Sequence, residues 1–91
     1  MRETISCIVE DYMDNKKVNI SLLEDSFKED ESHITFTVSG GLNGRGNWDD
    51  YLGVLRAIVT ELMQYFSSVW IVELKNDCLD DVFCCTYGVK K

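Results

Sequence analysis

The chain has 91 residues, with 16 acidic and nine basic side chains, a formal net charge of −7, 45% hydrophobic residues and no proline. This length allows one domain with one modest core, and it leaves little material for a deep enzyme pocket with a lid. The negative charge disfavours direct binding to nucleic acid or to an anionic membrane, and it favours a basic protein partner.

The N-terminal residues predict an amphipathic helix over residues 3–14. Apolar side chains recur there at helical spacing, and acids occupy the other faces. The β-branched residues of this segment leave a strand as the alternative. Its apolar run is too short for a secretory signal, and no segment of the chain reaches the length of a membrane span. We therefore expect a cytoplasmic protein with no membrane contact.

Two strands are expected next. Apolar and polar residues alternate over 18–22 and again over 34–38, which is typical of half-buried strands. Leu23 and Phe27 break the first alternation, so a bend or bulge is expected near Glu24 and Asp25. The acidic segment 24–31 is expected to be a solvated hairpin loop.

A glycine-rich break over 40–47 precedes the strongest helix pattern in the chain. Asn47 is a preferred N-cap residue, and Asp49 and Asp50 complement the helix dipole in the first turn. Apolar residues then recur at steps of three and four over 48–66. A stripe of this breadth needs a broad partner, most simply a sheet.

The C-terminal residues predict two further strands. The pattern indicates a strand buried on both faces over 69–74, a turn over 75–77 and a last strand over 82–87. The order α-β-β-α-β-β favours an α+β fold with a single domain over residues 1–91. We expect a four-stranded, mostly antiparallel sheet with the helices packed on one face.

The glycine segment is also a candidate anion site. Gly41, Gly44 and Gly46 lie between a predicted strand and a predicted helix, where backbone amides cradle phosphates. Arg45 supplies a counter-charge. The arrangement resembles the pyrophosphate loop of acetyltransferases that bind coenzyme A, over residues 34–74, although Gly41 replaces the usual polar or basic residue. The resemblance implies an acyltransferase-like or anion-binding protein, and the alternative is a flexible strand-to-helix connection.

The cysteines and the single histidine do not form a recognisable site by spacing. Cys84 and Cys85 are adjacent on a predicted strand and point to opposite faces, so both do not easily reach one metal ion. With Cys7 and Cys78 they are expected to be reduced, buried thiols. His33 is expected at the surface, with no local support for a cysteine–histidine pair. No cofactor, metal ion or catalytic residue is predicted.

The acidic residues gather in the 24–31 segment and at the ends of the predicted elements. Solubility explains part of this pattern. The alternative is an anionic interface that steers and holds a basic partner, with an aromatic anchor beside the acids. The candidate partner-binding residues are Glu24, Asp25, Glu29, Asp30, Glu31, Trp48, Asp49, Asp50, Asp80 and Asp81.

The leading hypothesis is a small acidic inhibitor and not an enzyme. It would cover the phosphate-binding surface of a basic nuclease or nucleic-acid-handling complex, as a mimic of nucleic acid. Immunity proteins of toxin systems and phage anti-CRISPR or anti-defence proteins are similar in size and acidity. The alternatives are a protein that binds an anion or coenzyme A through residues 41–46, and a homodimeric structural module that pairs through a sheet edge or the Trp70 face.

Overall fold

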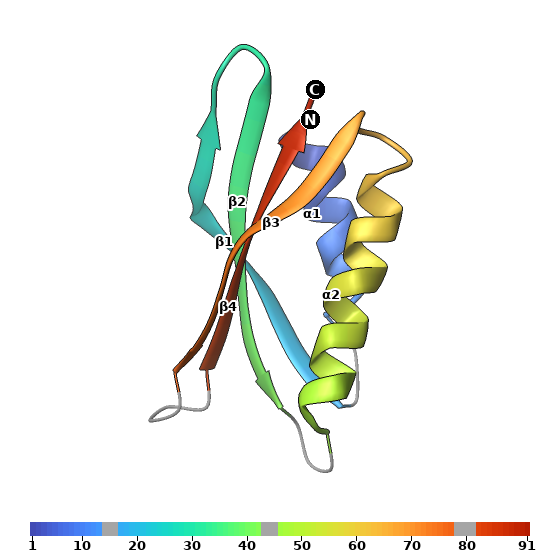
Figure 1. Cartoon of the computed structure of the whole chain (residues 1–91), viewed down its shortest axis with the longest axis vertical. Coiled ribbons are helices and arrows are strands. Elements are labelled where there is room, and N and C mark those ends of the chain that lie inside the picture. The colour runs from blue at the N-terminus through green and yellow to red at the C-terminus, as the bar shows by residue number, and fades with distance from the viewer. Residues whose placement is uncertain (14–16, 43–45, 78–81) are drawn as a thin grey trace.

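The computed structural model describes residues 1–13, 17–42, 46–77 and 82–91. Its elements are α1 (Arg2–Glu10), β1 (Val18–Glu29), β2 (His33–Leu42), α2 (Trp48–Leu62), β3 (Ser68–Asp77) and β4 (Val82–Lys90). The strands form one antiparallel sheet in the order β1-β2-β4-β3 (Figure 1). The predicted order α-β-β-α-β-β and the four-stranded antiparallel sheet are therefore confirmed.

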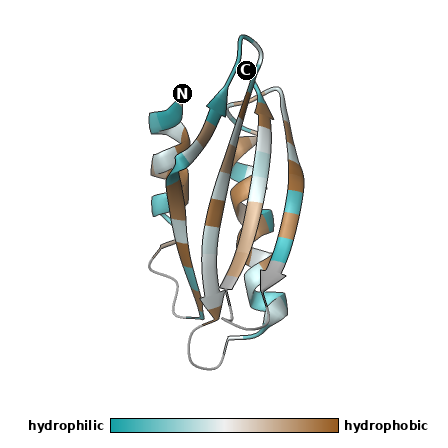
Figure 2. Cartoon of the chain, turned by 90° about the vertical axis from the view of Figure 1, so that its left-hand side faces the viewer, coloured by the Kyte–Doolittle hydropathy of each residue, from teal (hydrophilic) through white to brown (hydrophobic). Residues whose placement is uncertain are grey.

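The central strands β2 and β4 alternate between a core face and an opposite face. Ile34, Phe36 and Val38 of β2 are fully buried, and so are the residues paired with them in β4. Polar residues of the same strands point the other way, and Thr37 Oγ1 lies 2.8 Å from Thr86 Oγ1 on that opposite face. Figure 2 shows this alternation along β2 as bands of differing hydropathy.

The helices add their apolar stripes to the same core. α2 contacts β1, β2 and β3, whereas α1 contacts β1 and α2, and Figure 1 shows the two helices side by side. The Tyr87 hydroxyl of β4 donates a buried hydrogen bond of 3.0 Å to the Leu55 carbonyl of α2. In the described part of the chain, neither helix is long and apolar enough to cross a membrane.

The start of α2 is fixed by the N-cap that the sequence predicts. Asn47 Oδ1 accepts a hydrogen bond from the Asp50 N–H at 3.0 Å. In return, Asp50 Oδ2 accepts a hydrogen bond from the Asn47 N–H at 2.9 Å. This reciprocal capping box satisfies two backbone donors that the helix leaves free.

The connection between β1 and β2 is shorter than predicted. β1 continues through most of the acidic segment, and only residues 30–32 connect the two strands. Phe27 packs against Phe36, with ring centroids 5.7 Å apart, and this contact holds the acidic segment in the sheet. The predicted loop is therefore wrong over most of its length. The predicted bulge is confirmed, because the β1–β2 register shifts between Leu23 and Lys28.

β2 also runs further than predicted, through the first two glycines of the glycine segment. Gly40 permits this extension because the β1 backbone passes very close. A Cβ atom at Gly40 would lie 1.7 Å from the carbonyl oxygen of Asn19. β2 ends at Leu42, and residues 43–45 of the candidate anion loop lie outside the described residues.

β3 is an edge strand and not a strand buried on both faces. It pairs with β4 alone. Its residues Trp70, Ile71, Val72 and Leu74 are between 38% and 54% exposed. The predicted turn over 75–77 is also wrong, because the strand continues through these residues to pair with the start of β4.

The remaining element ends differ from the predicted ones by a few residues. α1 ends at Glu10 and α2 at Leu62, and each helix is followed by a turn. β4 continues past Gly88 as far as Lys90, because its last residues still pair with β2 and β3. Apolar residues continue at helical spacing into the packed turn that follows each helix. The pattern therefore predicts a longer helix than the one that forms.

Candidate partner-binding site

The acids predicted to bind a partner lie in separate parts of the molecule. Residues 24–25 are exposed within β1, and residues 29–31 are at the β1–β2 hairpin. Residues 49–50 are at the start of α2, which lies at the other end of the 40 Å long axis from the hairpin (Figure 1). Residues 80–81 lie outside the described residues. The structure thus separates the hairpin acids from those that begin α2.

Two of the hairpin acids hold the turn itself. Asp30 Oδ1 accepts backbone hydrogen bonds from Ser32 at 2.8 Å and from His33 at 2.7 Å. These two bonds lower the pKa of the Asp30 carboxyl below its ordinary value. Lys91 Nζ lies 3.3 Å from Glu29 Oε2, which ties the C-terminus to the hairpin. Both carboxylates therefore have a local structural role.

The predicted residues at the start of α2 are engaged in a similar way. Trp48 is half-buried and packs against Tyr51 and Phe83, with ring centroids 5.6 and 4.9 Å away. The Asp50 carboxylate completes the capping box and lies 3.8 Å from Lys17 Nζ. Because a carboxylate already accepts from the free backbone donor at this helix end, a phosphate is disfavoured there.

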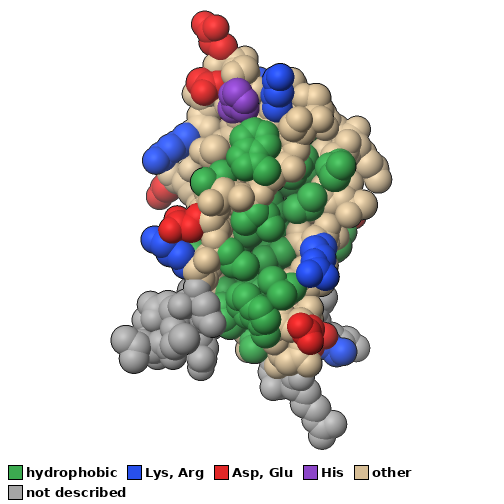
Figure 3. Space-filling view, in the orientation of Figure 1, with side chains coloured by type: hydrophobic (Ala, Val, Ile, Leu, Met, Phe, Trp, Pro, Cys, Tyr) green, Lys and Arg blue, Asp and Glu red, His purple; other side chains and the backbone are tan. Residues whose placement is uncertain are grey.

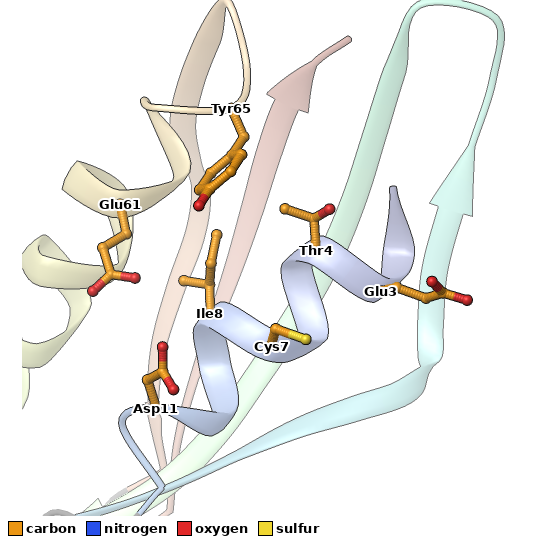
Figure 4. Close-up of a pocket in the computed structure, with 7 residues that line it drawn as sticks. All are labelled: Glu3, Thr4, Cys7, Ile8, Asp11, Glu61 and Tyr65. Carbon is orange, nitrogen blue, oxygen red and sulfur yellow. The ribbon is translucent and has the colours of Figure 1, made fainter.

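A groove between α1 and the end of α2 brings together acids that were not predicted as a site (Figure 4). Ile5 and Val9 anchor α1 in the core, and the neighbouring stripe of the helix, at steps of three and four, faces the end of α2. The resulting hollow has a volume of about 410 Å³. It is lined by Glu3, Thr4, Cys7, Ile8, Asp11, Glu61 and Tyr65.

The groove carries three carboxylates and, among the described residues that line it, no lysine or arginine. Figure 4 shows Asp11 and Glu61 directed toward each other, with Glu3 at the other end of the α1 stripe. The Tyr12 hydroxyl donates a hydrogen bond of 2.7 Å to Glu61 Oε1. This bond is the main reason that the pKa of Tyr12 is raised to about 12. It also holds the Glu61 carboxylate in position.

An apolar wall lies beside these carboxylates. Tyr65 is 60% exposed, and in Figure 4 its side chain extends toward Ile8. A guanidinium or ammonium group on a long alkyl stem suits this combination, because its charge meets the carboxylates while its stem covers the apolar surface. The tyrosine ring offers a further contact to such a cation.

The cysteines differ in exposure more than predicted. Cys85 is buried, and burial raises its pKa to about 11. Cys84 is half-buried on the other face of β4, so the predicted opposite orientation of the pair is confirmed. Cys7 is exposed at the groove, and the prediction of a buried thiol is wrong for it. Within the described ranges, no three histidine, cysteine, aspartate or glutamate side chains are placed so that they could hold one metal ion.

The sequence predicts only the α1 side of the groove. Once residues 3–14 are assigned as a helix, the spacing of Thr4, Ile8 and Asp11 already places them on one stripe. Glu61 and Tyr65 join them only through the packing of α2 beside α1, which has no local signature. Comparisons with protein-family models, with curated proteins and with solved structures found no match. Function is therefore inferred from the chain's own residues.

Proposed function

We propose that the chain is a small acidic inhibitor that covers the phosphate-binding surface of a basic nuclease or nucleic-acid-handling complex. The observation that carries this proposal is the α1–α2 groove, which is lined by three carboxylates and an exposed tyrosine. In this proposal the helices form one layer on one face of the sheet and present the groove to the partner. The setting is cytoplasmic, as the immunity protein of a toxin system or as a phage anti-CRISPR or anti-defence protein.

The proposed mechanism has two stages. The net charge of −7 first raises the rate at which a basic partner is encountered. An arginine side chain of the partner then enters the groove, where its guanidinium bonds to Asp11 and Glu61 and its stem lies against Ile8. A guanidinium that bonds to two carboxylates at once gains more than it would in an isolated surface ion pair.

Capture from an extract of the native host, prepared with and without infecting phage, tests the proposal. Immobilised protein should retain a basic protein at low salt and release it when the salt is raised, because screening weakens the attraction. The retained protein should cleave or bind nucleic acid, and the purified chain should inhibit that activity. A retained protein that is acidic, or whose nucleic-acid activity is unaffected by the chain, would contradict the proposal.

Two charge-matched double variants separate the groove from bulk charge. Asp11→Asn with Glu61→Gln removes two groove carboxylates and keeps an oxygen that accepts from Tyr12. The control, Glu10→Gln with Glu73→Gln, removes two exposed carboxylates that do not line the groove. We expect the groove variant to weaken binding about tenfold or more, and the control to change it by less than about threefold. Equal weakening by both would count against the groove.

A further inference from the structure

α1 contributes only a small part of the hydrophobic core. It contacts β1 and α2. Of the 18 buried hydrophobic side chains among the described residues, Ile5, Ile8 and Val9 are the three that belong to this helix. The others come from the sheet, from α2 and from the segment that follows α2. Most of the core would therefore remain assembled if α1 moved away.

The helix has little stability of its own. It is nine residues long, and four of the nine are β-branched. Isolated helices shorter than roughly 12–15 residues are marginal in water, and β-branched side chains lose rotational freedom in a helix. Glu3 complements the helix dipole in the first turn, but the last turn ends at Glu10 and has no basic residue. α1 therefore depends on its contacts with β1 and α2.

Charge pairing contributes little to these contacts. The ion pairs formed between described residues lie at the hairpin, at the start of α2 and on β3. Figure 3 shows acidic and basic side chains together around the margin of a hydrophobic surface. α1 instead brings Glu3 and Asp11 to the groove, where the described lining residues include no lysine or arginine. The attachment of α1 must come from other contacts.

Two side-chain contacts hold the two ends of α1. At its start, the Arg2 guanidinium lies over the Phe27 ring of β1, 5.1 Å from the ring centroid. Just after its end, the Tyr12 hydroxyl donates a hydrogen bond of 2.7 Å to Glu61 Oε1 of α2. A hydrogen bond to a carboxylate is stronger than one between neutral groups. We therefore expect the bond from Tyr12 to be the main contact that holds this end of α1 against α2.

We propose that α1 is a strap that opens as a unit while the sheet and α2 stay folded, and that the Tyr12–Glu61 hydrogen bond holds it closed. Local opening of this kind involves the elements with the fewest buried contacts. The groove is bounded by both helices, so it exists only while the strap is closed. A cation held in the groove and closure of the strap therefore favour each other. The opening is a property of the chain alone and does not depend on the proposed inhibitor function.

Amide hydrogen exchange of the chain alone, resolved by NMR, tests the strap. The amides of α1 should exchange about tenfold or more faster than those of β2 and β4, because they are released without unfolding of the sheet. Tyr12→Phe removes the hydrogen bond and should speed exchange in α1 about fivefold further. The amides of β2 and β4 should stay within about twofold of their wild-type rates.

Two further variants identify the bond itself. Tyr65→Phe removes an exposed tyrosine hydroxyl from the same groove and should leave exchange in α1 at the wild-type rate. Glu61→Met should match Tyr12→Phe, and the double variant should be no faster than either single variant, because both remove one interaction. Amides of α1 that exchange as slowly as those of β2 and β4 would overturn the proposal. So would wild-type exchange in Tyr12→Phe, or an equal increase in α1 and in the sheet.

Discussion

Two tyrosines in the core bury their hydroxyl groups with opposite consequences. The Tyr87 hydroxyl donates to the Leu55 carbonyl and so links β4 to α2. The Tyr51 hydroxyl is equally buried but has no hydrogen-bond partner among the described residues. Burial raises the pKa of both groups, so each stays neutral at ordinary pH. A buried donor without a partner costs free energy, whereas a satisfied one contributes a little.

Phenylalanine at each position should therefore change stability in opposite directions. Tyr51→Phe removes the unpaired hydroxyl and keeps the ring contacts with Trp48 and Phe83, so we expect a gain of about 1 kcal/mol in the free energy of unfolding. Tyr87→Phe removes the hydrogen bond and should cost about 1 kcal/mol. Urea unfolding followed by circular dichroism measures both. A loss of stability in Tyr51→Phe would show that its hydroxyl is satisfied.

Two glycines show how the same residue serves different elements. Gly53 is exposed within α2, and an added Cβ atom would meet nothing within 4 Å. Gly40 lies in β2, where the β1 backbone occupies the space that a Cβ atom needs. The first glycine only weakens its helix, because glycine loses more backbone freedom than alanine on folding. The second is required by the close approach of two strands.

Alanine should thus stabilise one element and break the pairing of the other. We expect Gly53→Ala to raise the free energy of unfolding by about 1 kcal/mol. Gly40→Ala should lower it by about 2 kcal/mol or more, because backbone atoms of Asn19 must move. Thermal unfolding of both variants against the wild type is the measurement. Equal stability of Gly40→Ala and the wild type would mean that β1 and β2 separate there at little cost.

Sequence patterns predict which helices and strands this chain forms better than they predict which of these elements lie next to one another. The alternation over 34–38 and the spacing over 48–66 predict β2 and α2, because burial on one face sets those periods. The Asn47 cap is local and is predicted for the same reason. Residues 69–74 are correctly predicted to form a strand, but the prediction that this strand is buried on both faces is wrong. A run of β-branched and aromatic residues describes a buried strand and an unpaired edge strand equally well.

The candidate site is harder to predict because it is formed by tertiary packing. Acids at the hairpin stand out in the sequence, yet Asp30 and Glu29 partly serve the turn and the C-terminus. The groove acids are spread between Glu3 and Glu61, and no spacing rule joins residues so far apart. Only the contact between α1 and α2 makes them neighbours.

Over the whole molecule, charge and apolar surface are kept apart. The groove carboxylates are on α1 and α2, whereas β3 exposes the apolar side chains of Trp70, Ile71, Val72 and Leu74. Salt should therefore act on the groove in particular, because screening weakens the attraction of its carboxylates to a basic partner.

The dissociation constant of the captured partner, measured against salt concentration, tests the central claim most directly. The comparison is between the wild type and the groove variant, Asp11→Asn with Glu61→Gln. We predict that the wild-type constant rises steeply with salt, and that the variant binds about tenfold more weakly at low salt, with a gap that narrows as salt is added. A dissociation constant indifferent to salt, or equal constants for both proteins at every salt concentration, would contradict the account.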